Sequence, residues 1–100
     1  MKHAIKHIHF IGICGTAMGS AAAALRALGH TITGSDQKVY PPMSTMLENR
    51  GIKLMEGYKP ENLPADADCI VVGNAISRGN SEVEAVLERR LPYTSLAELL

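Results

Sequence analysis

The sequence predicts an α/β protein with a Rossmann-like, three-layer fold around a mostly parallel sheet of about five strands. Two apolar runs, at residues 7–13 and 69–73, each lead into a glycine-bearing loop that precedes a helical pattern. Short β-branched or alternating runs separate the other helical patterns, so strands alternate with helices. Because such alternation packs as parallel strands with right-handed crossovers, we expect the 100 residues to form one domain.

The first strand, at 7–13, is apolar on both faces beyond His9, as a central parallel strand should be. The helix after it, at 17–28, carries an apolar stripe at helical spacing and ends before Gly29. The other strands are expected at 31–34, 52–55, 69–73 and 91–93, with at most one helical turn in the polar connection at 57–68.

Local patterns mark three further helix starts. The prolyl pair at 41–42 precedes one of them, because proline is tolerated at the start of a helix but not inside it. Ser81 is followed three residues later by Glu84, and Ser95 by Glu98, and both pairs match a capping box.

The composition fits a globular domain with no nucleic-acid or membrane partner. Hydrophobic residues make up 46% of the chain, which is enough for a core. Ten basic residues balance ten acidic ones, which removes the electrostatic argument for nucleic-acid binding. Glycines interrupt the apolar stretch that ends at Leu25, so we expect neither a signal peptide nor a membrane span. Cys14 and Cys69 are expected to be free thiols of a cytoplasmic protein.

The segment 12–19 is a modified dinucleotide-binding fingerprint. Gly12 fills the first glycine position and Ala17 the last, whereas Cys14 takes the middle position and Gly15 follows it. A helix that starts at such a turn offers free backbone N–H groups to a phosphate. The side chain of Cys14 counts against an ordinary nicotinamide site, because it crowds the pyrophosphate. A tight turn that binds nothing is the alternative interpretation.

Asp36 stands 24 residues after Gly12, near the spacing of an acid that bonds a ribose hydroxyl. Its alternative role is to cap or solvate the loop at 37–42. The loops at 12–19, 34–36 and 73–80 all follow predicted strands, so a parallel sheet brings them to one edge. This convergence predicts a site for a nucleotide with a ribose and a diphosphate.

We assign no catalytic residue and no metal site. The sequence contains no G-x-x-x-x-G-K-[ST] loop and no paired-carboxylate or Ser-His-Asp pattern. His3, His7 and His9 lack further ligands at a recognisable spacing and are expected to be ordinary histidines. A reactive thiol at Cys14 remains open, but it would need a His or Asp partner. The sequence therefore predicts a binding domain rather than a complete catalyst.

Three separated motifs resemble the Mur ligases that act on UDP-N-acetylmuramate. They are the segment 8–19, Gly-Ser-Asp at 34–36, and the segment 73–80 that precedes Glu82. The segment 39–45, together with Cys14 and Asn74, is similar to the murein peptide ligase branch, because the L-alanine-adding branch usually has G-I-G-G in the turn and a serine pair before Ala-Ile-Ser.

The resemblance implies a three-domain, cytoplasmic, ATP-dependent ligase of peptidoglycan recycling, cell-wall biogenesis and cell shape. This chain would be its N-terminal domain, spanning residues 1–100 of a longer protein, and would be inactive alone. The missing domains would bind ATP, Mg²⁺ and the murein tripeptide. ATP would phosphorylate the muramyl carboxylate, and the tripeptide amine would attack the acyl phosphate.

The resemblance also implies which residues bind the UDP-sugar. Backbone N–H groups at 15–18 would hold the diphosphate, Asp36 would bond ribose or uracil, and Arg78 would pair with an anionic group or remain solvated. The expected binding residues are Gly12, Cys14, Gly15, Thr16, Ala17, Met18, Ser35, Asp36, Asn74, Ala75, Ile76, Ser77 and Arg78. The alternatives are an L-alanine ligase domain, an NAD-binding domain of an oxidoreductase or redox sensor, and a module that kept the fold but lost its ligand.

Overall fold

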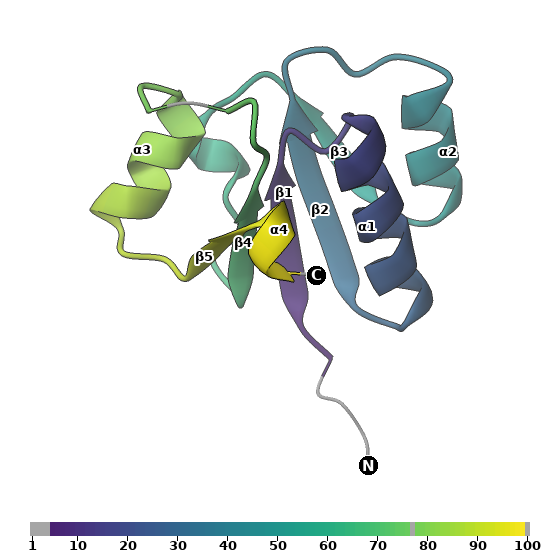
Figure 1. Ribbon diagram of the computed structural model, residues 1–100, viewed down its shortest axis with the longest axis horizontal. Coiled ribbons are helices and arrows are strands. Elements are labelled where there is room, and N and C mark those ends of the chain that lie inside the picture. The colour runs from purple at the N-terminus through teal and green to yellow at the C-terminus, as the bar shows by residue number, and fades with distance from the viewer. Residues whose placement is uncertain (1–4, 77, 100) are drawn as a thin grey trace.

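The computed structural model describes residues 5–76 and 78–99 and contains a five-stranded parallel sheet in the order β3-β2-β1-β4-β5 (Figure 1). The predicted fold class is therefore confirmed. The strands are β1 (His7–Ile11), β2 (Thr31–Asp36), β3 (Lys53–Glu56), β4 (Cys69–Val72) and β5 (Tyr93–Ser95).

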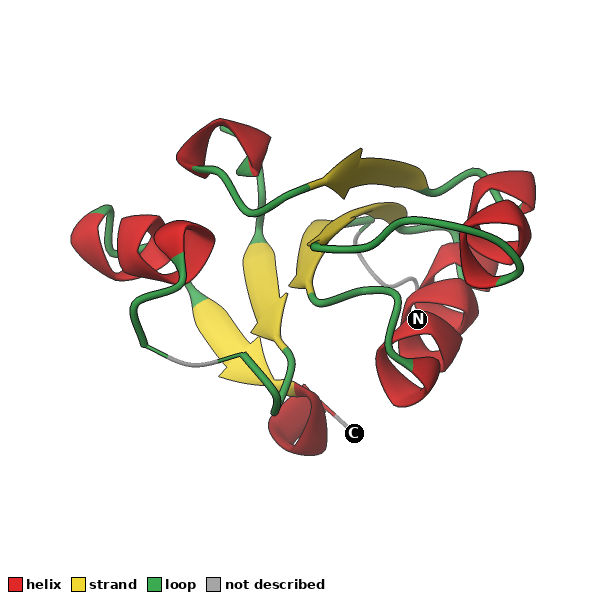
Figure 2. Ribbon diagram, turned by 90° about the horizontal axis from the view of Figure 1, so that it is seen from above, coloured by secondary structure: helices red, strands yellow, loops and turns green. Residues whose placement is uncertain are grey.

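Helices lie on both sides of this sheet (Figure 2). They are α1 (Thr16–Ala27), α2 (Met43–Asn49), α3 (Ser81–Glu88) and α4 (Leu96–Leu99), with a 3₁₀ turn η1 (Pro60–Asn62). The turn η1 is the single helical turn predicted in the polar connection. The last strand, β5, begins two residues later than the predicted strand at 91–93.

Two apolar cores, one on each face, hold the layers together. Phe10 points to the face that α1 and α2 cover, where it packs in a cluster with Ile32 and Leu47. Ile11, its neighbour on β1, belongs to the cluster under α3 with Ile70. Successive side chains of a strand point to opposite faces, so one strand serves both cores.

The start of α3 differs from the prediction. Asn80, rather than Ser81, is the N-cap, and its side chain accepts hydrogen bonds from the N–H groups of Glu82 and Val83 at 2.9 and 3.2 Å. The carboxylate of Glu84 instead accepts hydrogen bonds from the preceding loop, from Arg78 and from the backbone N–H of Gly79. Asn80 has the extended backbone that an N-cap needs, whereas Ser81 is already helical.

The second predicted capping pair forms one of the two bonds of a capping box, and its side chains also bond each other. The backbone N–H of Glu98 donates to the Ser95 hydroxyl at 3.3 Å, and that hydroxyl donates to the Glu98 carboxylate at 3.1 Å. None of the helices in the described part of the chain combines the length and apolar character that crossing a bilayer requires. Cys14 and Cys69 are both free thiols.

Candidate functional site

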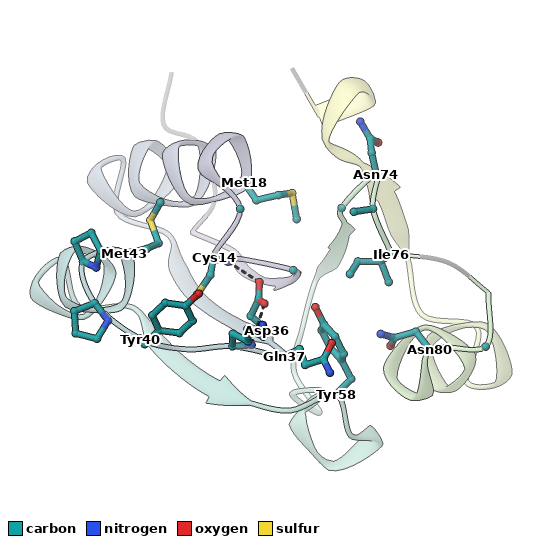
Figure 3. A pocket seen from close by; sticks show the side chains of 18 of the residues that line it. Cys14, Met18, Asp36, Gln37, Tyr40, Met43, Tyr58, Asn74, Ile76 and Asn80 are labelled. Atoms are coloured by element: carbon teal, nitrogen blue, oxygen red, sulfur yellow. Dashed lines mark hydrogen bonds between the residues drawn. The ribbon is translucent and has the colours of Figure 1, made fainter.

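A cavity of about 990 Å³ lies at the carboxyl edge of the sheet, where the three predicted loops meet. Figure 3 shows Cys14, Asp36 and Tyr40 on one side of it, Ile76 and Asn80 on the other, and Tyr58 between them. The lining comprises Gly12, Cys14, Gly15, Met18, Asp36, Gln37, Lys38, Tyr40, Pro41, Pro42, Met43, Tyr58, Gly73, Asn74, Ala75, Ile76, Arg78, Gly79 and Asn80.

The glycine turn is fixed to β2 and leaves the start of α1 open. The N–H groups of Gly12 and Ile13 both donate to the carbonyl of Ser35, at 2.8 and 3.0 Å. Gly12 has a φ of 91°, and a Cβ there would lie 3.3 Å from the side chain of Ile76. Gly15 is the N-cap, and Gly19 donates back to it at 2.7 Å. The N–H groups of the intervening first turn are the ones that a helix leaves unpaired.

Asp36 serves the fold as well as lining the cavity. One carboxylate oxygen accepts from the backbone N–H of Cys14 at 2.9 Å, and the other accepts from that of Lys38 at 3.3 Å. The alternative role, capping the loop at 37–42, is therefore present in the structure. The expected contact with ribose or uracil stays a prediction.

Cys14 is not placed as an activated nucleophile. Burial raises the pKa of its thiol, and the nearby negative charge of Asp36 raises it further. A catalytic thiol needs the opposite shift, toward the thiolate. Cys14 is therefore a neutral thiol in the wall of the cavity.

The loop after β4 forms the opposite wall. Its first residue, Gly73, donates to the carbonyl of Ile11 at 3.0 Å. Arg78 donates from Nε to Oε2 of Glu84 at 2.9 Å, but its side chain remains 77% exposed. This hydrogen bond with Glu84, together with the carboxylate's charge, raises the pKa of Arg78. Ser77, one of the expected binding residues, lies outside the described residues.

Three expected binding residues lie elsewhere. Thr16 and Ala17 are exposed in the first turn of α1 and lie outside the cavity lining, which includes their neighbours Gly15 and Met18. Ser35 is fully buried, and its hydroxyl donates to Glu82 at 2.8 Å. Its side chain therefore lies behind the cavity, whereas its carbonyl holds the glycine turn.

Glu82 is a buried acid that sequence reasoning had placed only in a motif and at a helix start. Its Oε1 lies 2.8 Å from Nε2 of His9 and accepts from Ser35, and its Oε2 accepts from Asn62 at 2.9 Å. Burial alone would raise the pKa of Glu82, but the hydrogen bonds and the charge of His9 outweigh burial and lower it. Glu82 therefore stays ionised.

Tyr58 is the cavity residue that sequence reasoning missed most clearly. It follows β3, and the carboxyl ends of all parallel strands meet at the same edge, so an aromatic just after a strand was a usable signal. Burial raises the pKa of Tyr58, as does the charge of Asp36, partly offset by a hydrogen bond with the backbone of Gln37. Tyr58 is therefore a neutral phenol.

The histidines of β1 are engaged in hydrogen bonds. His7 lies 2.9 Å from Asp66 and 3.1 Å from Thr33, and His9 bonds Thr33 and Glu82. Within residues 5–76 and 78–99, no group of three His, Cys, Asp or Glu side chains gathers that could hold a metal ion. His3 lies outside these residues.

Comparison with known proteins gives a consistent result. The model of the Mur ligase family, catalytic domain, matches residues 7–100. The chain is 56% identical over 88 residues to the UDP-N-acetylmuramate–L-alanyl-γ-D-glutamyl-meso-2,6-diaminoheptandioate ligase of Escherichia coli, covering 88% of this chain and 19% of that protein. It is 40% identical over 100 residues to a UDP-N-acetylmuramate–L-alanine ligase of Dechloromonas aromatica, covering 100% of this chain and 21% of that protein.

Among solved structures, a murein peptide ligase from Psychrobacter arcticus matches with a TM-score of 0.90 and 53% identity, covering 95% of this chain and 20% of that one. The chain thus spans about a fifth of the length of these relatives. The family match extends over all five strands of the sheet and includes all three loops of the cavity. The chain belongs to the Mur ligase family.

Proposed function

We propose that the cavity binds UDP-N-acetylmuramate, and that the chain is the N-terminal substrate-binding domain of a ligase that joins recycled murein tripeptide to this UDP-sugar. The observation that carries the proposal is the open first turn of α1, which faces a cavity walled by three loops. Backbone N–H groups and the helix dipole favour a diphosphate there.

Other groups around the cavity suit the remaining parts of a UDP-sugar. Asp36 can accept from a ribose or uracil group in addition to its two backbone donors, because an ionised carboxylate has about four acceptor sites. Lys38 and Arg78 bring positive charge to the cavity wall. The loop that begins at Asn74 would then contact the diphosphate and the sugar.

The residues present do not fit ATP with Mg²⁺. The sequence has no phosphate-binding loop with a G-K-[ST] end, and the described part of the chain brings together no acidic cluster. We therefore derive no step through ATP, and we place ATP, Mg²⁺ and the tripeptide in other domains of a cytoplasmic enzyme.

Particular residues favour the recycling ligase over an L-alanine ligase domain and over an NAD-binding domain. Cys14 and Asn74 match the murein peptide branch, and the identity to the diaminoheptandioate ligase, 56%, exceeds the 40% to the L-alanine ligase. An NAD site is disfavoured because Cys14 occupies the position where a pyrophosphate needs glycine.

Titration calorimetry on the 100-residue chain tests the proposal. We expect binding of UDP-N-acetylmuramate and of UDP, weak binding of NAD, and no ATP hydrolysis. Tyr93→Phe, a change on the exposed edge strand away from the cavity lining, should bind as the wild type does. Tighter binding of NAD than of the UDP-sugar would overturn the proposal.

A further inference from the structure

A chain of hydrogen bonds runs from the surface to the buried carboxylate of Glu82. At the outer end, Asp66, whose side chain is 83% exposed, lies 2.9 Å from Nδ1 of His7. Nε2 of His7 lies 3.1 Å from Oγ1 of Thr33, which lies 2.8 Å from Nδ1 of His9. Nε2 of His9 then lies 2.8 Å from Oε1 of Glu82.

All four contacts of this hydrogen-bond chain can be hydrogen bonds only if the ring nitrogens of His7 and His9 carry one particular number of hydrogens. The ionised carboxylates at its ends can only accept, so Nδ1 of His7 and Nε2 of His9 must each carry a hydrogen. Thr33 has one hydroxyl hydrogen for two ring nitrogens, and the ring that does not receive it must donate to the hydroxyl oxygen. Hydrogen bonds at all four contacts therefore require three nitrogen-bound hydrogens on the two rings together.

The second oxygen of Glu82 holds part of the cavity wall. Oε2 accepts from the backbone N–H of Lys59 at 3.2 Å and from Nδ2 of Asn62 at 2.9 Å. Nδ2 of Asn62 also donates to the carbonyl of Gly57 at 2.8 Å. These contacts fasten the backbone on both sides of Tyr58, which lines the cavity.

We propose that Glu82 is a positioning residue: its carboxylate holds the Tyr58 segment in the cavity wall, and one proton shared between His7 and His9 balances its buried charge. The effect on ligand binding rests on the proposed function, whereas the proton count and the hold on the segment do not.

The groups that form or face this hydrogen-bond chain, besides Glu82, come from three elements and from the loop before β4. β1 supplies the two histidines, β2 supplies Thr33 and the Ser35 hydroxyl, and η1 supplies the Asn62 amide. At the outer end, Asp68 lies beside Asp66 and accepts from the backbone N–H of His7 at 2.7 Å. The charges in direct contact with this hydrogen-bond chain are therefore acidic at both ends.

Ring-nitrogen NMR of the chain labelled with ¹⁵N-histidine counts the hydrogens directly. At neutral pH we expect three on the two rings. In Glu82→Gln the amide oxygen can accept from Lys59 and Asn62, and the amide nitrogen can donate to His9 and to the Ser35 hydroxyl oxygen, which reverses the Ser35 bond. The contacts of the two histidine rings are then satisfied with one ring hydrogen fewer. Glu88→Gln, the same change in charge at the exposed end of α3, should leave the count at three.

Amide exchange at Lys59 and the affinity for UDP-N-acetylmuramate test the hold on the Tyr58 segment. We expect Glu82→Ala to speed this exchange and to weaken binding by about tenfold, the scale of one lost charge-assisted hydrogen bond. Glu82→Gln should rescue the slow exchange and most of the affinity. Asn62→Ala removes the hydrogen bond between Asn62 and Glu82. It tests the positioning role of Glu82 if Glu82→Ala does not fold.

Two or four ring hydrogens in the wild type, or an unchanged count in Glu82→Gln, would overturn the shared proton. Unchanged exchange at Lys59 in both Glu82→Ala and Asn62→Ala would overturn the positioning role. If the NMR results are as expected but the wild type does not bind the UDP-sugar, the proposed function fails and this inference stands.

Discussion

The same strands make two faces that differ in chemistry: the face toward α1 and α2 is apolar, whereas the face toward α3 combines polar side chains with an apolar cluster around Ile11 and Ile70. Toward α1 and α2, neighbouring positions of β1 and β2 present an apolar row: Ile8, Phe10, Ile32 and Gly34. Toward α3, the alternate positions present a polar row: His7, His9, Thr33 and Ser35. The parallel register sets Ile8 beside Ile32 and His9 beside Thr33, whereas Ile11, at the end of β1, lies beside Ser35.

This difference separates stability from positioning. Apolar packing is not directional, so the row with Phe10 stabilises the fold without fixing any one atom at the cavity. Hydrogen bonds are directional, and each described buried side-chain polar atom has a partner. The polar row therefore determines, through Glu82, where the Tyr58 wall lies, whereas the backbone carbonyl of Ser35 holds the glycine turn.

Phe10→Ala should produce the largest effect, a loss of about 3–5 kcal/mol in the free energy of unfolding, because it removes a fully buried ring from the apolar row. Denaturant unfolding followed by circular dichroism measures it. Leu28→Ala, at a side chain that is exposed, is the control and should change little. A loss below about 1 kcal/mol for Phe10→Ala would contradict the role of the apolar row.

Gly34→Ala should cost about 1–3 kcal/mol, because overpacking forces neighbours to shift. A Cβ at Gly34 would lie 2.3 Å from Cδ1 of Ile13, which packs against this strand. Gly79→Ala is the matched control for space, since a Cβ there meets nothing within 4 Å, although its positive φ adds strain. Equal stability of Gly34→Ala and the wild type would show that packing around the apolar row can accommodate an added methyl group.

Asp36→Ala should weaken binding of UDP by about 1–3 kcal/mol, the scale of losing the partner of a buried donor or a charge-assisted hydrogen bond. Asp36→Asn separates the two roles of this residue, since its amide oxygen can still accept from the N–H of Cys14. We expect Asn to retain the fold and lose part of the affinity. Calorimetry that finds full affinity in Asp36→Ala would remove this residue from the site.

The smallest expected effect is a pH dependence of stability from the polar row. The pKa of Glu82 is lowered in the folded chain, so its stabilisation is complete above the ordinary glutamate range and is lost as the pH falls through the lowered pKa. In a plot of the free energy of unfolding against pH, Glu82→Gln should reduce the loss of stability at acid pH, whereas Glu88→Gln should not. If Glu82→Gln loses as much stability at acid pH as the wild type, the acid sensitivity comes from other carboxylates.

The fold and much of the cavity follow from local patterns. The apolar runs, the glycine turn and the strand-end position of Asp36 are signals within a few residues, and they predicted a parallel sheet with three loops at one edge. Asn80 and Ser81 are adjacent and equally suited to cap a helix, so only the backbone decides between them.

Contacts between distant residues could not be predicted in the same way. His9 and Glu82 are 73 positions apart, and neither carries a local sign that it will meet the other. The buried position of Ser35 also depends on which face of β2 turns toward α3. The sequence placed Ser35 at the correct edge of the sheet. That its side chain meets Glu82 depends on the face of β2 that turns toward α3.

The central position of β1 has a consequence for how the chain folds during synthesis. β1 pairs with β2 on one side but with β4 on the other, and the paired residues of β1 and β4 lie about 60 positions apart. At about 5–20 residues per second, a ribosome takes roughly 3–12 s to make that interval. For this time one edge of the first strand has no partner in its own chain, and other nascent chains can pair with it.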